Sequence, residues 1–497
     1  MSLPSARLFQ PLLASPTTAR WVVLGCFTWA FVVRLRFLSA TPQPVGVDGY
    51  YYAIQVRSLL ESGELFYPAS PLVFWWLVPF AALTDPIVGV KLGAAAGTAA
   101  SVFPVYLLIQ RLSGDRAAGV VGAAAAATSA QSIYLSTEFV KQGVGLTLTL
   151  AFLAALVEAL ARPTRPRMVL AISLLGLTLL AHKLAFAVAL LVALPAFARV
   201  VWGWRPRARL GALIAAGLFG VALVCANGNG LAHTFHARTD FSFATLVRGN
   251  GARLFFQHEV RLAALAACLV MALWLRDRWL PPARLMEGER RSPVVLGFVL
   301  LCLVFSMPWL NVEDRQGLAM RLRLTAFLPL SVFAGLLFSR MFVFASGVPR
   351  ATVCAASVAA LFLLRPSRPG EGTVTVMQDR AEAVHELEGL IPPGALVITT
   401  DRHLAFMTTW HTRASARKSV PPRIESARTY RLMATAALDG PFWDSLDACR
   451  PGAAPAEWGL GDAPRILSGA MVLLTERCFQ EVSNHLPAAS QLPGREW

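Results

Sequence analysis

Long apolar runs alternate with short polar loops along most of the 497-residue chain. A helix that crosses a bilayer needs about 20 mostly apolar residues, and eleven runs reach or approach this length. They are 21–38, 87–110, 116–133, 141–160, 167–181, 184–202, 209–226, 260–275, 293–309, 319–339 and 350–364. The pattern predicts an all-α polytopic membrane protein with about 11 transmembrane helices.

The final segment, 365–497, has a different pattern. ALVITT (395–400) and AMVLLT (470–475) are typical of buried strands, and DRAEAVHELEGL (379–390) has the periodicity of an amphipathic helix. Stretches rich in proline and glycine separate these elements. The sequence therefore predicts a multi-helix transmembrane domain, 1–364, followed by a small α/β C-terminal domain.

The polar loops predict the orientation of the helices. If the N-terminus lies inside, the connections on the inner side all contain arginine and most are rich in it, as the positive-inside rule requires. These connections are 111–116, 162–167, 202–209, 276–291 and 340–350. The first outer loop, 39–86, the late outer loop, 227–259, and the C-terminal domain are then extracytoplasmic.

One short apolar segment decides this topology. Residues 71–83 contain Pro79 and are too short for a typical span. As a twelfth spanning helix, they would invert every later loop and place the arginines outside. Their two tryptophans suit the headgroup level, so the pattern favours an interfacial or re-entrant helix, and the spanning alternative stays open.

Composition supports a membrane protein. Hydrophobic residues make up 56% of the chain and charged residues only 15%, whereas a soluble domain is about one quarter charged. The net charge of +16 does not indicate nucleic-acid binding, because the arginines that carry most of it cluster in short loops. Cys449 and Cys478, the two cysteines of the tail, could form a disulfide if the tail lies outside the cytoplasm.

In this topology, ionisable and aromatic residues from several segments share the outer face. They are Arg34, Asp48, Tyr51, Tyr52, Glu138, Lys141, His182, Arg315, Arg321 and Arg323. Arginine forks bind phosphate oxygens, a carboxylate can deprotonate a hydroxyl, and tyrosine rings suit sugar and prenyl packing. The set favours a substrate with a lipid-phosphate end and a sugar end.

Local structure offers simpler roles for the same residues. Asp48 can cap a helix that runs to about Ser62 and ends at Gly63. Glu138 and Lys141 stand three apart on a helix and could pair. The turn at His182 could reach the interface, and Arg34 could anchor at headgroup phosphates. None of these roles excludes chemistry.

The order of short motifs resembles the GT-C superfamily of membrane glycosyltransferases. The first helix ends with arginine, D-x-x-Y-Y follows at 48–52, and K-x-x-x-G-L begins at Lys141, three residues after Glu138. Members of this superfamily use polyprenyl-phosphate sugars. They include protein O-mannosyltransferases, lipid A aminoarabinose transferases and the oligosaccharyltransferase catalytic subunit. The likeness covers about residues 20–190, together with the plan of many helices and an outer C-terminal domain.

The resemblance implies roles for individual residues. Asp48 is similar to the first-loop catalytic acid, which acts on an acceptor hydroxyl, and Glu138 is similar to the second-loop acid, which helps to hold acceptor or metal. The departing lipid phosphate would meet an arginine of the set Arg315, Arg321 and Arg323. Gly49 replaces the second acid that follows the first in the paired-acid form. The tail lacks W-W-D-Y-G, which argues against N-linked oligosaccharide transfer.

The sequence thus predicts an integral inner-membrane or plasma-membrane glycosyltransferase whose active face is extracytoplasmic, and periplasmic in a Gram-negative bacterium. Its expected donor is a polyprenyl-phosphate sugar carrying a hexose or pentose, and its acceptor a glycan, lipid or protein. Asp48 and Glu138 could hold a divalent ion such as Mg²⁺ or Mn²⁺, and could equally act without one.

Three alternatives stay open. A transporter or flippase of lipid-linked sugars would place charges or broken helices near the middle of the membrane. An O-antigen ligase or polymerase would use the basic late outer loop, 227–259. An inactive scaffolding member of the superfamily would fit the missing second acid at Gly49.

Overall fold

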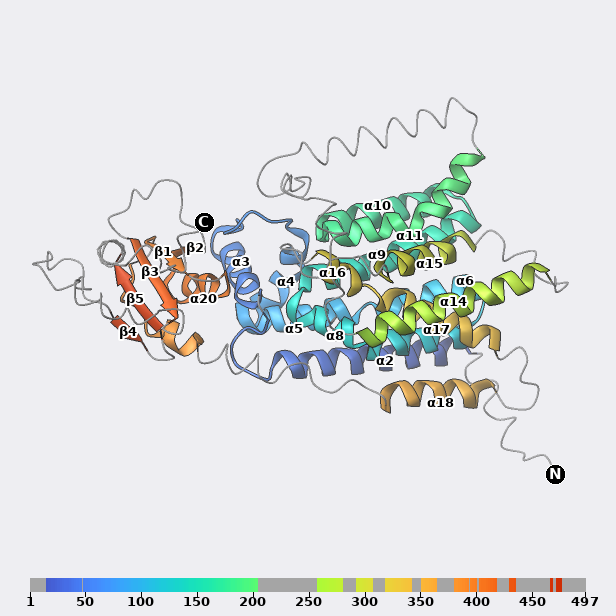
Figure 1. The fold of residues 1–497 in the computed structure, drawn as a ribbon, viewed down its shortest axis with the longest axis horizontal. Helices are drawn as coiled ribbons and strands as arrows, with labels where there is room; N and C mark the ends of the chain where they lie inside the picture. Colours follow the sequence, from blue (N-terminus) through green and yellow to red (C-terminus); the bar gives the residue numbers. More distant parts are fainter. Residues whose placement is uncertain are drawn as a thin grey trace, which may run out of the picture. The chain divides into compact units, whose positions relative to one another are not determined.

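The computed structural model describes most of the helical region and parts of the tail. The described ranges are 15–46, 48–203, 257–279, 292–306, 318–341, 350–363, 380–392, 394–399, 402–417, 429–434, 465–467 and 471–475. These residues fall into two compact units. The first holds nearly all the helices, and the second combines residues of the first outer loop with the tail (Figure 1).

The first unit is built from apolar helices. They are α2 (Pro16–Leu38), α4 (Leu72–Leu83), α5 (Pro86–Ala99, whose first residues group with the second unit), α6 (Val102–Ser113), α7 (Arg116–Thr128), α8 (Ala130–Glu138), α9 (Val140–Ala161), α10 (Arg165–Ala181), α11 (Lys183–Trp202), α14 (Gln257–Trp279), α15 (Ser292–Ser306), α16 (Leu318–Arg323), α17 (Phe327–Met341) and α18 (Arg350–Leu363). Ten of the eleven predicted runs coincide with these helices, and the run 209–226 lies outside the described residues.

Six segments of the described chain are long and apolar enough to cross a membrane. They are Pro16–Leu38, Pro86–Ser113, Val140–Ala161, Lys183–Trp202, His258–Arg276 and Ala319–Arg340. Shorter apolar helices occur at Leu72–Leu83, Pro293–Ser306 and Thr352–Leu363. The prediction of a multi-helix membrane protein is confirmed at this level, whereas the count of about 11 spans and their orientation stay predictions.

Helix α7 lies at the centre of the first unit. Every residue from Ala117 to Thr128 is buried, and α7 packs against α2, α6, α17 and α18. Small side chains make this close packing possible. A Cβ added at Gly335 of α17 would stand 2.6 Å from the carbonyl oxygen of Ala118.

The prediction of one continuous helix over 116–133 is wrong, because the helix breaks at Ser129. This residue has an extended backbone, with ψ of 126°, and its side chain accepts a hydrogen bond from the Ser132 amide at 3.1 Å. Ser129 is therefore the N-cap of a separate helix, α8. The apolar, alanine-rich run hides this break, since serine interrupts the pattern without adding a charge.

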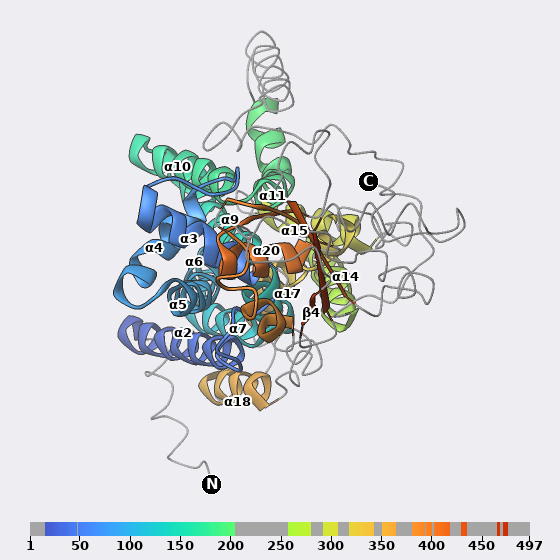
Figure 2. The same ribbon diagram turned by 90° about the vertical axis from the view of Figure 1, so that its left-hand side faces the viewer.

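The predicted inner ends of α6, α9 and α10 are joined by one acid. Glu158 of α9 pairs with Arg111 at 3.5 Å and with Arg167 at 3.4 Å. Arg111 also donates to the Ala154 carbonyl oxygen at 2.6 Å. Two arginines of the predicted inner loops thus stabilise the packing of neighbouring helices. Figures 1 and 2 show α9, α10 and α11 side by side.

The segment 71–83 forms helix α4, as predicted. Trp75 and Trp76 are partly exposed, and the Trp76 indole donates to the Gly93 carbonyl oxygen of α5 at 2.9 Å. The helix has 12 residues, fewer than a straight span requires. Its interfacial or re-entrant placement stays a prediction.

The second unit contains helix α3 (Gly49–Ser62), helix α20 (Arg402–Thr412) and a five-stranded sheet. The strands are β1 (Leu396–Thr399), β2 (Ser415–Arg417), β3 (Thr429–Ala434), β4 (Arg465–Leu467) and β5 (Met471–Thr475), in the order β2-β1-β3-β5-β4. β1 pairs in parallel with β2 and β3, and β5 pairs antiparallel with β3 and β4. The predicted strands 395–400 and 470–475 are confirmed as β1 and β5. The expected helix at 379–390 is helical over 380–385 and continues as turns.

Candidate functional site

Asp48 stands at the start of α3, where the sequence places it. The helix ends at Ser62, and Gly63 has φ of 76°, in the left-handed region that favours glycine. The backbone carbonyl of Asp48 accepts a hydrogen bond from the Tyr52 amide at 3.1 Å. Its side chain makes no cap hydrogen bond to the helix. The predicted role of the Asp48 side chain as a helix cap is therefore wrong, and capping does not account for its carboxylate.

Aromatic contacts hold α3 against α20 within the second unit. The Tyr50 ring centroid lies 6.2 Å from that of His403 and 5.9 Å from that of His411. The Tyr50 hydroxyl donates to Gln43 Oε1 at 2.6 Å, and burial raises the pKa of Tyr50. The phenol therefore stays protonated and can keep donating at neutral pH.

A cation adds to this contact about two helical turns further along α3. The Arg57 guanidinium lies 4.2 Å from the Trp410 ring centroid and donates to the Trp410 carbonyl oxygen at 3.0 Å. Tyr51 contacts Phe406 with ring centroids 5.3 Å apart. Tyr51 and Tyr52 are both buried. Packing accounts for the tyrosine cluster, and contact of Tyr51 or Tyr52 with substrate stays a prediction.

A cluster of cations surrounds His182 in the first unit. His182 has an extended backbone between α10 and α11, which confirms the predicted turn. Burial lowers the pKa of His182 well below 6.5, and the charges of Lys141, Arg321 and Lys183 lower it further. The imidazole is therefore neutral at physiological pH. Three positive charges from α9, α11 and α16 act on one buried ring.

Two of these cations lie in the first turn of a helix. Lys141 follows Val140 at the start of α9, and Lys183 is the first residue of α11. Neither N-cap residue, Phe139 or His182, makes a side-chain cap hydrogen bond. The helix dipole disfavours positive charge at an N-terminus and favours an anion there. The arrangement therefore concentrates positive potential that a bound anion would relieve.

Two buried polar atoms at the same place have no hydrogen-bond partner within the described part of the chain. They are Nδ1 of His182 and Oε1 of Gln142. The Gln142 amide nitrogen donates to the Arg321 carbonyl oxygen at 2.8 Å, and the Arg321 guanidinium lies 4.6 Å from the Phe139 ring centroid. A phosphate oxygen could accept from His182, and a hydroxyl could donate to Gln142.

Helix α8 connects this cluster to the rest of the first unit, and sequence reasoning missed the residue that anchors it. Glu259 of α14 accepts hydrogen bonds from the Ser129 hydroxyl at 2.7 Å, the Ala130 amide at 2.6 Å and the Gln131 amide at 3.3 Å. Its carboxylate thus binds the N-terminus of α8. Glu138 is the last residue of the same helix. The sequence feature that could have revealed Glu259 is a single acid at the start of an apolar helix.

The Gln131 side chain bridges α8 to the break between α16 and α17. It donates to the Arg323 carbonyl oxygen at 3.1 Å and accepts from the Phe327 amide at 3.0 Å. Arg323 itself is buried and donates to the Phe305 carbonyl oxygen at 3.2 Å. Arg323 therefore contributes to helix packing, and phosphate binding by it stays a prediction.

Arg34 also packs against α8. Its side chain is 0% exposed, and it donates to the Ser132 hydroxyl at 2.8 Å, the Ala127 carbonyl oxygen at 3.4 Å and the Ala30 carbonyl oxygen at 3.0 Å. These contacts join α2 to α7 and α8. They explain why Arg34 is buried even when no substrate is bound, so phosphate binding by Arg34 stays a prediction.

Several predicted features are not tested by the described residues. Asp48 belongs to the second unit and Glu138 to the first, so a metal ion shared by the two stays a prediction. Arg315, Cys449, Cys478 and the loop 227–259, apart from its last residues, lie outside the described residues. The described residues of the first outer loop also cross the predicted domain boundary, because 39–66 group with the tail.

The fold has solved counterparts. The crystal structure of ArnT from Cupriavidus metallidurans in the apo state matches with a TM-score of 0.55 and 14% identity, over 92% of this chain and 98% of that chain. The structure of the same protein bound to undecaprenyl phosphate matches with a TM-score of 0.55 and 13% identity, over 93% and 98%. No family model and no curated protein sequence matches the chain. ArnT is a GT-C enzyme, so the predicted GT-C-like fold is confirmed.

Proposed function

We propose that the chain is a membrane glycosyltransferase that moves a sugar from a polyprenyl-phosphate donor to an acceptor hydroxyl on the extracytoplasmic face. The cation cluster of Lys141, His182, Lys183 and Arg321 carries this proposal. It combines uncapped helix N-termini with positive side chains, which is the chemistry that binds a phosphate. The likeness to ArnT, which has been solved with undecaprenyl phosphate bound, supports a lipid phosphate as the anion.

The charge change of the reaction suits such a cluster. The bond between the anomeric carbon and the phosphate oxygen breaks, and its electron pair stays on the phosphate. A phosphodiester with one negative charge thereby becomes a phosphomonoester that can carry two. Cations that meet this developing charge stabilise the transition state more than the bound donor. Lys141, Lys183 and Arg321 would supply that stabilisation, and the His182 imidazole would donate one hydrogen bond.

Asp48 is the proposed base. The acceptor hydroxyl oxygen forms the new bond to the anomeric carbon, and its proton moves to the Asp48 carboxylate. Asp48 suits this role because its side chain does not cap α3, while the contacts of Tyr50 and Arg57 with α20 fix the helix that carries it. The acceptor is a glycan, lipid or protein, and the sugar is a hexose or pentose.

The test is sugar transfer by the purified chain in lipid nanodiscs, with a panel of polyprenyl-phosphate sugars. Lys141→Gln should lower kcat by about tenfold or more, since one charge-assisted contact contributes about 1.5–3 kcal/mol. Asp48→Asn should abolish turnover and retain donor binding, because the amide cannot accept the proton. Arg165→Gln is the matched control. Arg165 is an exposed cation at the opposite end of α10 from His182.

The outcomes separate the candidate functions. Transfer that is lost in both Asp48→Asn and Lys141→Gln, and kept in Arg165→Gln, supports the proposal. Transfer that survives in Asp48→Asn would move the base elsewhere. Tight donor binding without turnover on any donor, together with movement of the lipid across vesicle membranes, would favour a flippase over a transferase.

A further inference from the structure

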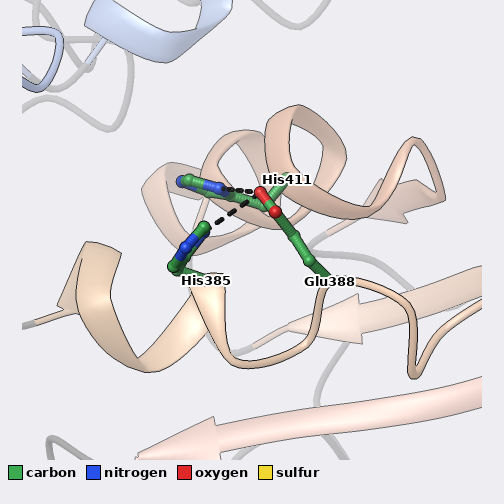
Figure 3. A group of neighbouring side chains, drawn as sticks. All are labelled: His385, Glu388 and His411. Atoms are coloured by element: carbon green, nitrogen blue, oxygen red, sulfur yellow. Dashed lines mark hydrogen bonds and ion pairs between the residues drawn. The ribbon is translucent and has the colours of Figure 1, made fainter.

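A second group of titratable side chains lies in the second unit, on residues that the proposed transfer does not use. His385 and Glu388 stand three residues apart at the end of the helical turn 380–385, and His411 lies at the end of α20. Figure 3 shows the three side chains converging, with both imidazoles directed toward one carboxylate. Nδ1 of His411 lies 2.7 Å from Glu388 Oε1, and Nδ1 of His385 lies 3.1 Å from the same oxygen.

The spacing of these atoms is close to that of a metal-ligand set. The three ligand atoms all lie within 4.8 Å of one another. In a tetrahedral zinc site, bonds of about 2.0–2.1 Å place neighbouring ligand atoms about 3.3 Å apart. The observed separations from Glu388 are slightly shorter than this value. A small outward rotation of the carboxylate would therefore open room for an ion between the three groups.

Packing does not require this cluster. The side chain of His385 is 66% exposed and that of Glu388 is 45% exposed, so neither has to be paired to avoid burying an unpaired polar group. Only His411 is nearly buried, at 8% exposure. Exposed pairs contribute little to stability in water. Both imidazoles converge on one Glu388 oxygen, and a shared ion could take the place of these two direct contacts.

We propose that His385, Glu388 and His411 bind a divalent transition metal ion of the zinc class, with water as the remaining ligand. Two imidazole nitrogens and one carboxylate oxygen favour Zn²⁺ over Mg²⁺ and Ca²⁺, which prefer all-oxygen sites. Coordination through Nδ1 places the ring proton on Nε2. The Nε2 atom of His411 is buried and has no hydrogen-bond partner within the described residues.

The ion would join elements that are separate in sequence. Residues His385 and Glu388 precede β1, and His411 ends α20, so coordination would cross-link the start of the α/β fold to this helix. The His411 ring also contacts Tyr50 of α3. The site is distinct from the ion predicted for Asp48 and Glu138, because it uses none of their residues. Its role is to stabilise the second unit.

The experiment measures zinc binding to the purified full-length chain after its affinity tag is removed. Protein freed of metal with a chelator is titrated with ZnCl₂ by calorimetry, and bound zinc is counted after dialysis. Cobalt(II) serves as a second probe, because its visible absorption depends on its coordination number and on its nitrogen and oxygen ligands. His385→Ala and Glu388→Gln are the test variants, since both side chains are exposed enough to change without disturbing the fold.

His258→Ala is the matched control, because His258 is an exposed histidine of α14 in the first unit. We expect the natural chain and the control to bind one zinc ion, and both test variants to lose at least about tenfold in affinity. Equal zinc affinity in all four proteins, or no zinc binding by the natural chain, would overturn the proposal. The readout needs no sugar transfer, so its result is independent of the proposed function.

Discussion

Replacing Glu259 should destabilise the N-terminus of α8 without changing any residue at its C-terminal end. In Glu259→Ala, the amides of Ala130 and Gln131 lose their acceptor, and the Ser129 hydroxyl loses the acceptor of its proton while still accepting from the Ser132 amide. A buried donor left without an acceptor costs about 1–3 kcal/mol. The Ala130 bond, at 2.6 Å, should count fully, and the Gln131 bond, at 3.3 Å, only in part. The expected loss in free energy of unfolding is therefore about 2–4 kcal/mol.

Glu259→Gln provides the comparison that isolates capping from charge. The amide oxygen can still accept from the Ala130 backbone, and the amide nitrogen can donate to the Ser129 hydroxyl. Only the extra strength of a charged acceptor is lost, about 1 kcal/mol. The measurement is unfolding by SDS titration in mixed micelles, with His258→Ala as a neighbouring exposed control. Equal stability of the alanine and glutamine variants would refute the capping argument.

Three further changes test other parts of the structure. Gly145→Ala should destabilise the chain by about 1–3 kcal/mol, because a Cβ there would stand 2.8 Å from the Ala185 Cβ and 3.0 Å from the His182 Cβ. Unfolding by SDS titration measures the loss, and unchanged stability would contradict the prediction. Burial lowers the pKa of His182 below 6.5, so the unfolded chain binds the proton more readily and the stability of the fold should decrease as the pH drops below 6.5. In thermal unfolding measured over a series of pH values, His182→Gln should reduce this decrease. Arg57→Met should remove a 4.2 Å cation–π contact and a backbone hydrogen bond to Trp410, and should raise proteolysis of α3, unlike substitution of the exposed Arg417 of β2 by Met.

The sequence predicted the features whose causes are local. Helix α3 ends where a glycine can adopt positive φ, at Gly63. The turn at His182 separates two apolar runs, and strands β1 and β5 are short runs of apolar residues bounded by polar ones. In each case, the residues next to the feature in the sequence were sufficient to predict it. Lys141 and Arg321 were also among the predicted residues, because each is a charged residue at the end of an apolar run.

The features that were missed depend on partners far apart in the chain. The break at Ser129 is stabilised by Glu259, 130 residues later. Arg34 was expected at the headgroups, but residues of α7 and α8 bury it. The grouping of α3 with the tail depends on contacts such as Arg57 with Trp410, 353 residues apart. Periodicity along one segment contains no information on such partners.

The two lysines at helix N-termini are unfavourable for folding and favourable for binding an anion. Lys141 and Lys183 lie where the helix dipole makes positive charge unfavourable, by about 0.3–1 kcal/mol each at a surface. The neutral state of His182 limits this repulsion, since a third charge between them would add to it. Gln131 and Glu259 hold α8 through hydrogen bonds. The support of α8 therefore adds no positive charge to that of the cluster. Acids would be more favourable for stability at these two positions, so the lysines support the proposed phosphate site.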